Sequence, residues 1–506
     1  MRAKRLSRGR WMVVVGCLLV IGLAWLMVWW ARDGLVVRPL THNGIPMRLI
    51  APANTGPVPG VIIAHGFSGS QQLMLGFAYT LAHAGYATLL LDFDGHAANP
   101  APLGREMTRG AAALQANMDA AYAALVAQPE VDDGRVALLG HSMGSGAVMT
   151  AGIINPERYQ AAVAVSPTDA AVTETEPRNL LLQAGQLEPQ FAANAEDLLA
   201  RAGGANTDFA NGRARSFQLI PGVEHITILF SPTAHQTAVG WLGQTFGLLT
   251  TAAYIDRRMV WYLVQLAAWL VLAAAITPAI RQPRITPYFR RPPWHVIGLF
   301  VAPLVATAVL WLANQIIPVG QLGGILIAGA QGLWFLIFGL VWLALGWRWR
   351  QSPISPSFGK LRTTLSISSS LRALAIFAFL WLAFGLMAQV VWLPWFLIPV
   401  RLLRWPLLAL AFVPWLLAAG RAQQGASMGK RIGWWVGQSG VLMVGLGTAV
   451  LFVPSLFFLV LVLPVLPIVL GIMALVGGAV DDPWAYGLGN ALFFAWLLLA
   501  LFPLAG

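Results

Sequence analysis

The chain has 506 residues, of which 58% are hydrophobic and only 10% are charged. Charged residues make up about a quarter of an ordinary soluble protein, so this composition excludes a purely soluble chain. The formal net charge is +12, but the stretch from Arg32 to Arg257 contains 18 of the 20 carboxylates and only 12 of the 32 basic residues. The positive excess therefore lies in short segments that flank hydrophobic runs, a pattern that indicates membrane topology rather than nucleic-acid binding.

The first 31 residues predict a basic cytoplasmic segment followed by a membrane anchor. Residues 1–10 carry five basic side chains, and residues 11–31 form an uncharged run long enough to span a bilayer as a helix. The run is longer than the core of a cleaved signal peptide, and no small-residue cleavage site follows it, so we expect a retained transmembrane signal anchor. Because basic flanks stay in the cytoplasm, the residues after Arg32 should lie on the extracytoplasmic side of the cell membrane. Cys17 is the single cysteine and excludes an intramolecular disulfide.

Residues 32–255 have the pattern of a soluble α/β domain. Short apolar runs alternate with amphipathic stretches and with turns rich in Gly, Pro and Asp. An Asn43-Gly44 turn predicts a hairpin over residues 35–50. Further strands are expected at 61–65, 87–92, 136–140, 161–165, 180–183 and 216–220, and helices at about 71–84, 105–128, 143–154, 190–202 and 234–249. This alternation predicts a mostly parallel sheet with helices on both faces.

Residues 258–506 predict an all-α, multi-span transmembrane domain of about eight helices. The spans are expected near 259–279, 296–317, 322–346, 373–397, 405–420, 433–453, 455–478 and 484–504, which makes about nine with the N-terminal anchor. Many of the 22 tryptophans lie near the predicted span ends, as interface anchors do. No Asp, Glu, Lys or Arg lies in the middle of a predicted span, which argues against an ion-coupled transporter.

The connecting loops carry charges that bear on this topology. Basic residues cluster at 281–291, 348–372 and 421–431, and alternation from a cytoplasmic N-terminus places all three clusters in the cytoplasm. Arg401 and Arg404 are exceptions because alternation places them outside, and either an interfacial position or one miscounted span would explain them. Residues 352–370 are rich in Ser, Thr and Pro and predict a flexible cytoplasmic linker.

The strongest chemical signal is the motif Gly140-His141-Ser142-Met143-Gly144. It follows an apolar strand and precedes a helix, which is the context of a nucleophile elbow. In such a turn the serine takes strained backbone angles, and the elbow glycines, Gly140 and Gly144, avoid clashes with the strand and the helix. Ser142 is therefore the expected nucleophile, and a tight turn with an incidentally exposed serine is the structural alternative.

A second motif, His65-Gly66-Phe67-Ser68-Gly69-Ser70, follows the strand at 61–65. With the elbow, it makes the chain resemble the α/β-hydrolase superfamily over about residues 35–250, and in particular its serine esterases, lipases and dienelactone hydrolases. The resemblance implies that the backbone N–H groups of Phe67 and Met143 form an oxyanion hole. Family members with a large lid insert it after the sixth strand, where residues 166–179 leave no room for one.

The family order of nucleophile, acid and histidine makes His225 the expected general base, because it lies in a loop after the last predicted strand. Five other histidines compete with it: His65, His83, His96, His141 and His235. For the acid, Glu188 in Gly185-Gln186-Leu187-Glu188 matches the family position, although Asp is commoner there. Asp169 is the alternative acid, because some members take theirs after the preceding strand.

Together these residues predict a membrane-bound serine hydrolase that cleaves an ester through an acyl-enzyme, with an amide or thioester as the other options. The expected partners are a small-molecule or lipid acyl substrate and the bilayer, without nucleic acid. No cofactor or metal is expected, since no nucleotide-binding motif or histidine pair at ligand spacing is present. A transporter or assembly protein with a hydrolase-like ligand-binding domain, and an acyltransferase, remain as alternatives.

Overall fold

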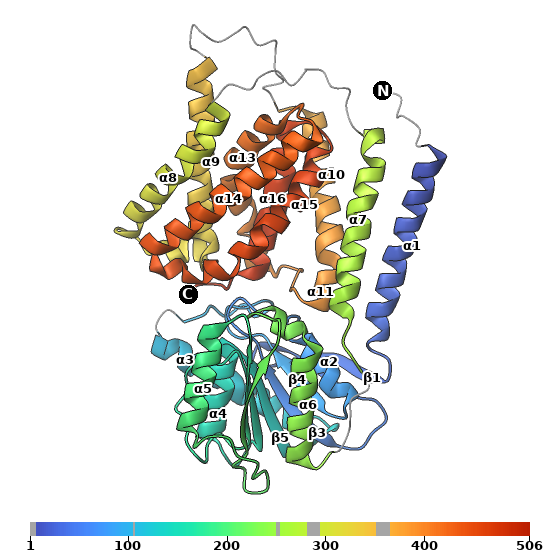
Figure 1. Ribbon diagram of the computed structural model, residues 1–506, viewed down its shortest axis with the longest axis vertical. Coiled ribbons are helices and arrows are strands. Elements are labelled where there is room, and N and C mark those ends of the chain that lie inside the picture. The colour runs from blue at the N-terminus through green and yellow to red at the C-terminus, as the bar shows by residue number, and fades with distance from the viewer. Residues whose placement is uncertain (1–6, 105–106, 249–253, 281–293, 351–364) are drawn as a thin grey trace. The chain divides into compact units, whose positions relative to one another are not determined.

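The computed structural model describes residues 7–104, 107–248, 254–280, 294–350 and 365–506, which form two compact units (Figure 1). The sheet unit comprises Ala24–Leu263, Ala388–Ile398 and Pro503–Gly506, and the helical unit comprises Met1–Leu23, Val264–Met387 and Pro399–Phe502. Several predictions fall at least partly outside the described residues: the charges of residues 1–6, the basic clusters at 281–291 and 348–372, the linker up to residue 364, and one end of each of the helices expected at about 105–128 and 234–249.

The sheet unit is built on eight strands in the order β1-β2-β4-β3-β5-β6-β7-β8. The strands are β1 (Leu35–His42), β2 (Ile45–Pro52), β3 (Val58–Ala64), β4 (Ala87–Leu91), β5 (Val131–His141), β6 (Ala161–Val165), β7 (Leu180–Gly185) and β8 (Arg215–Ile220). β1 and β2 form the predicted antiparallel hairpin around Asn43-Gly44, and β2 pairs antiparallel with β4. All other neighbours are parallel, so the prediction of a mostly parallel sheet is confirmed.

Helices cover both faces of this sheet, as the alternating pattern predicts (Figure 1). They are α2 (Leu75–His83), α3 (Met107–Val126), α4 (Met143–Ile154), α5 (Pro189–Arg201) and α6 (Pro232–Phe246). Apolar side chains of α3, α4 and α5 pack on one face, and those of α2 and α6 pack on the other. The central strand β6 (AAVAV) is an unbroken apolar run because both of its faces are buried, and the second half of β5 is equally buried.

The carboxyl ends of the parallel strands meet at one edge of the sheet, since parallel neighbours run in the same direction. Loops that follow β3, β5, β6, β7 and β8 all leave from this edge. In open parallel sheets this is the edge at which ligands bind. The motifs singled out in the sequence lie in these loops.

The helical unit and its connections to the sheet unit consist mainly of apolar helices, most of them long. They are α1 (Arg8–Trp30), α7 (Arg258–Ile280), α8 (Trp294–Asn314), α9 (Ala328–Arg350), α10 (Ile367–Leu380), α11 (Met387–Val391), α12 (Pro399–Leu402), α13 (Trp405–Gln423), α14 (Met428–Phe452), α15 (Leu466–Gly478) and α16 (Pro483–Leu501). Within the described ranges, eight helices are long and apolar enough to cross a membrane. A ninth span results if Pro454–Leu461 and Leu463–Gly478, bent by 46°, count as one. These helices are compatible with an integral membrane protein.

Arg401 and Arg404, the exceptions to the charge rule, bond to backbone carbonyls inside the helical unit. Arg401 is 1% exposed and donates to the carbonyls of Leu499 and Phe502. Arg404 donates to the carbonyl of Gly323, 3.0 Å away, and to that of Val400. A buried guanidinium needs such acceptors, and these carbonyls explain how Arg401 can lie inside the helical unit.

Candidate active site

Ser142 lies at the turn between β5 and α4, with φ 51° and ψ −121°. Positive φ is uncommon for a residue with a side chain and marks local strain, which here turns the chain sharply from strand to helix. A methyl group on Gly144 would lie 2.5 Å from the carbonyl oxygen of Ala64, and one on Gly140 would overlap the carbonyl of Gly144. Only glycine fits at these two positions, so the sequence motif produces the elbow through close backbone packing.

Three side chains from separate loops form a continuous hydrogen-bonded chain at the carboxyl edge of the sheet. The Ser142 hydroxyl lies 3.1 Å from Nε2 of His225, and Nδ1 of His225 lies 2.8 Å from Oε2 of Glu188. Ser142 follows β5, Glu188 follows β7, and His225 follows β8. His225 and Glu188 are each 6% exposed, whereas Ser142 is partly open to solvent. The structure thus brings together the three residues expected to be nucleophile, acid and base.

The Glu188 carboxylate is fixed on its other oxygen by two donors. Oε1 accepts from the backbone N–H of Gly185 at 2.6 Å and from the hydroxyl of Ser166 at 2.7 Å. Asp169, the alternative acid, instead has a side chain that is 77% exposed and pairs with Arg201 at the surface. The orientation of the histidine ring therefore depends on Glu188.

The His225 ring is held between two other rings. Phe191 of α5 stacks on it with 4.2 Å between ring centroids and 23° between planes. On another side lies His141, at 4.7 Å, whose Nε2–H donates to the backbone carbonyl of His225 over 2.9 Å. Burial, followed by the neighbouring His225, holds the pKa of His141 well below its usual value, so His141 stays neutral beside the base.

The loop expected to supply an oxyanion donor lies against the nucleophile. A methyl group on Gly66 would lie 3.1 Å from Cβ of Ser142, so this backbone passes directly beside the serine. Phe67 is the next residue, and its ring packs edge-on against His96. Met143 is the first residue of α4, where a backbone N–H has no acceptor within its own helix. Both expected donor segments therefore flank Ser142.

The competing histidines each bond to the backbone. His65 is fully buried, donates from Nδ1 to the Gly66 carbonyl and accepts at Nε2 from the Phe93 N–H. Burial lowers the pKa of His65 to about 4. The remaining three donate to carbonyls as follows: His83 to Ala31, His96 to Asp94, and His235 to Leu229. These bonds fix loops and helices around the site, which is a structural role.

The loop after β4 forms a further wall of this edge and is tied down by polar contacts. Asp92 is 1% exposed and accepts from the backbone and side chain of Gln71 and from the Ala98 N–H. Burial raises the pKa of Asp92 to about 6. At the far end of the same loop, the backbone of Leu504 donates to the Gly95 carbonyl and accepts from the Leu103 N–H. The contacts that hold this loop come from residues far away in the sequence, so no local motif predicts them.

Sequence reasoning missed Ser166, Phe191 and the supporting role of His141. Ser166 directly follows β6 at the carboxyl edge, and that position was the available signal for it. Phe191 lies on the first turn of α5, three residues after Glu188. Its proximity to Glu188 could be predicted from the sequence, but its stacking on His225 could not. Among the described residues, no group of three or more His, Cys, Asp or Glu side chains could hold a metal ion.

Comparison with known proteins concerns mainly this unit. Residues 56–199 match a family model described as serine aminopeptidase, S33. An uncharacterised protein of Mycobacterium tuberculosis is 31% identical over 101 residues, which cover 20% of this chain and 34% of that protein. The match thus spans about a third of the length of the curated relative.

Two solved structures are also similar to the chain. A CIB-like hydrolase from Thermoplasma acidophilum shares 16% identity and covers 41% of this chain and 97% of its own, with a TM-score of 0.33. A dienelactone hydrolase from Anabaena variabilis shares 19% identity and covers 42% of this chain and 98% of its own, with a TM-score of 0.32. The family match at 56–199 includes Phe67, Ser142 and Glu188, and ends before His225.

Proposed function

We propose that this chain, whose sheet unit is an α/β-hydrolase domain, is a membrane-bound serine hydrolase that cleaves carboxylic esters through an acyl-enzyme. The observation that carries the proposal is the continuous chain from Ser142 through His225 to Glu188, with the serine in a strained elbow. A buried carboxylate that orients an imidazole, which in turn contacts a serine hydroxyl, is the arrangement that activates serine for acyl transfer.

The reaction that this geometry supports has two halves. The Ser142 oxygen attacks the ester carbonyl while Nε2 of His225 takes the hydroxyl proton, and Glu188 stabilises the resulting imidazolium. The carbonyl electron pair moves to the oxyanion, which the N–H groups of Phe67 and Met143 receive. The intermediate collapses with loss of the alcohol, which takes its proton from His225. Water then repeats the sequence, releases the acid and restores the serine.

Cleavage of an ester is favoured over removal of an N-terminal residue from a peptide, although the family description names an aminopeptidase. An aminopeptidase needs a free carboxylate near the serine to hold the substrate ammonium group. In the described loops of this edge, Glu188 is committed to His225, and Asp92 to Gln71 and Ala98. Glu224, beside the base, accepts from the N–H groups of Ile226 and Thr227. Asp94, half-buried after β4, accepts from the side chain of Asn99 through Oδ1. Each of these carboxylates has a donor within the fold, and hydrolysis of aminoacyl p-nitroanilides tests whether one of them also holds a substrate ammonium group.

The apolar helices and basic clusters of the polypeptide indicate where the substrate lies. We infer that the apolar helices hold the domain at the cell membrane, with the domain on the extracytoplasmic side because the basic clusters flank the opposite ends of the spans. An enzyme held there acts on acyl compounds near or in the bilayer, and the short 166–179 connection leaves no large lid over Ser142.

The test is covalent labelling of the full-length protein in membranes with a fluorophosphonate probe, followed by hydrolysis of p-nitrophenyl esters of increasing chain length and of aminoacyl p-nitroanilides. The wild type should be labelled and should cleave the esters, and Ser142→Ala should abolish both. Ser216→Ala, on edge strand β8 and outside the site, is the matched control and should behave as wild type. Labelling that survives Ser142→Ala would overturn the nucleophile, and cleavage of the anilides alone would overturn the ester substrate.

A further inference from the structure

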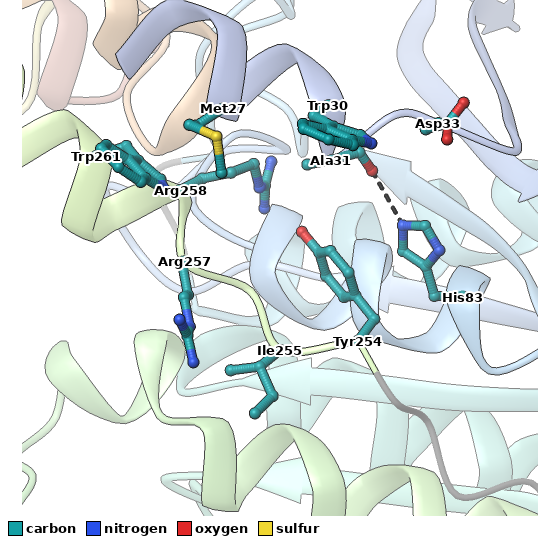
Figure 2. A pocket seen from close by; sticks show the side chains of 10 residues that line it. All are labelled: Met27, Trp30, Ala31, Asp33, His83, Tyr254, Ile255, Arg257, Arg258 and Trp261. Carbon is teal, nitrogen blue, oxygen red and sulfur yellow. Dashed lines mark hydrogen bonds between the residues drawn. The ribbon is translucent and has the colours of Figure 1, made fainter. Parts of the chain in front are cut away.

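A cavity of about 440 Å³ lies where the chain leaves α1 and where it enters α7, entirely within the sheet unit (Figure 2). Trp30 is the last residue of α1 and Trp261 lies on the first turn of α7. Both helices are candidate membrane spans, and tryptophan at the end of a span marks the level of the lipid headgroups. The cavity therefore opens at headgroup depth if α1 and α7 cross the bilayer.

The floor of the cavity is rigid. His83, the last residue of α2, donates to the Ala31 carbonyl over 3.0 Å, and its ring stacks on Tyr254 with 4.1 Å between centroids (Figure 2). The Tyr254 hydroxyl donates to Asp256 over 3.2 Å. These contacts connect the end of α1, the end of α2 and the segment before α7, so that the cavity has fixed walls.

One side of the cavity is basic. Arg258 is 2% exposed, and its Nε and one terminal nitrogen donate to Asp256, while Nη1 is buried without a hydrogen-bond partner. The neighbouring Arg257 is exposed, lines the same cavity and has no ion pair within the described part of the chain. Since Asp256 balances Arg258, Arg257 contributes one uncompensated positive charge. The amino end of α7 adds a partial positive charge at this place.

The other side of the cavity carries one carboxylate. Figure 2 shows Asp33 on the side opposite to Arg257, with the aromatic side chains of Trp30 and Tyr254 between them. Asp33 is exposed and, among the described residues, forms no ion pair. A ligand that pairs with both side chains carries an anionic group and a cationic group.

We propose that this cavity binds the headgroup of an amino-phospholipid, with the phosphate at Arg257 and the ammonium group at Asp33. The acyl chains would lie along the apolar surfaces of α1 and α7, where Leu26 is 58% exposed and Leu263 is 56% exposed. The cavity is separate from the active site, because α2 begins after the oxyanion loop and ends at His83 on the cavity wall. The bound lipid holds the hydrolase domain against the bilayer and takes no part in the acyl transfer.

The experiment measures the unfolding midpoint of the full-length protein in a phosphate-free maltoside detergent. Phosphatidylethanolamine should raise the midpoint by about 5 °C once the lipid exceeds its dissociation constant a hundredfold. Phosphatidylglycerol should raise it less, because it has no ammonium group for Asp33. Two soluble compounds separate recognition of the headgroup from binding of the whole lipid: glycerophosphoethanolamine, which has the headgroup without acyl chains, and inorganic phosphate. A full shift with inorganic phosphate alone would overturn the lipid ligand.

Two variants locate the effect. Arg257→Gln should remove the shift with both lipids, and Asp33→Asn should reduce the shift with phosphatidylethanolamine to that with phosphatidylglycerol. Arg213→Gln is the matched control, because Arg213 is an exposed arginine in another part of the sheet unit. Fluorophosphonate labelling of Ser142 should be unchanged in all three, which shows that they fold and separates this proposal from the catalytic one. An equal lipid shift in wild type and Arg257→Gln would overturn the site.

Discussion

The hydroxyl of Ser166 donates to Oε1 of Glu188 over 2.7 Å, on the carboxylate oxygen opposite to the one that faces His225. The two residues follow adjacent parallel strands, β6 and β7, so the register of the sheet brings them together. Glutamate has one more rotatable bond than aspartate, and a second anchored oxygen removes that freedom. The buried pair therefore supports a fixed acid at a position where aspartate is the commoner residue.

The charge of Glu188 is the first feature to test. Glu188→Gln keeps the size of the side chain but loses the negative charge that stabilises the imidazolium, so we expect kcat for ester hydrolysis to fall by about 10⁴-fold with little change in KM. Asp169→Asn should have no effect on kcat, because Asp169 lies at the surface beside Arg201. Steady-state kinetics on a p-nitrophenyl ester measures both, and the reverse order of effects would reassign the acid to Asp169.

Ser166 is a positioning residue, since it acts through Glu188. Ser166→Ala removes one hydrogen bond to a charged group, and the expected cost of about 1.5–3 kcal/mol corresponds to a roughly 10- to 100-fold fall in kcat. KM should stay unchanged, because Ser166 contacts the acid and not the substrate. Ser216→Ala serves as control, and a change in KM without a change in kcat would contradict the positioning role.

Gly144 tests the packing of the elbow. In Gly144→Ala the new methyl group would press on the backbone oxygens of Ala64 and His65, at 2.5 and 2.6 Å, and displace the loop that carries Phe67. Activity should fall below detection, with a clear loss of thermal stability. Gly240→Ala on α6 has open space around the added methyl group and should be neutral or slightly stabilising, as helix propensity predicts. Retained activity in Gly144→Ala would show that the loop does not depend on this contact.

Acid should destabilise the sheet unit through its buried histidines. The pKa of His65 is about 4 in the fold and about 6.5 in an unfolded chain, so the unfolded state gains a proton first as the pH falls. The stabilising contribution is complete above pH 6.5 and is lost on the way down to pH 4, by roughly 3 kcal/mol for His65 alone. Asp92 acts in the opposite direction: its pKa is raised to about 6, so its protonation between pH 6 and pH 4 favours the folded state and offsets part of the loss.

The corresponding measurement is the unfolding midpoint of the full-length protein between pH 8 and pH 4.5. As the pH is lowered below 6.5, the unfolding midpoint of the wild type should decrease. In His65→Asn the decrease with pH should be less steep, whatever that variant does to stability at pH 8. Parallel curves for the two proteins would show that His65 does not cause the acid sensitivity.

The membrane orientation can be tested with cysteines, because Cys17 is the only native one. In a Cys17→Ala background, Asn211→Cys places a thiol on the exposed surface of the sheet unit, and Ser427→Cys places one before α14, near the basic cluster at 421–431. A membrane-impermeant maleimide added to intact cells should label the first variant and not the second. The opposite result would place the hydrolase domain in the cytoplasm.

Features that depend on neighbouring residues along the chain could be predicted from the amino-acid sequence. The elbow at Ser142 is one of these, because the strand, the turn and the helix that create its strain are contiguous. The alternation of strands and helices and the long apolar runs are others, since both follow from local periodicity. His225 could be ranked first among the histidines because it lies in the loop directly after the last predicted strand, whereas His235 lies on the helix beyond that loop.

Tertiary structure alone decided which loops meet. Glu188 and Asp169 were both plausible acids in the sequence, and strand register places one beside His225 and the other beside Arg201. The stacking of Phe191 on the base and the anchoring of Glu188 by Ser166 join residues whose proximity no local pattern encodes. The cavity between α1 and α7 is the clearest case, because its walls come from segments more than 200 residues apart that only the folded chain brings together.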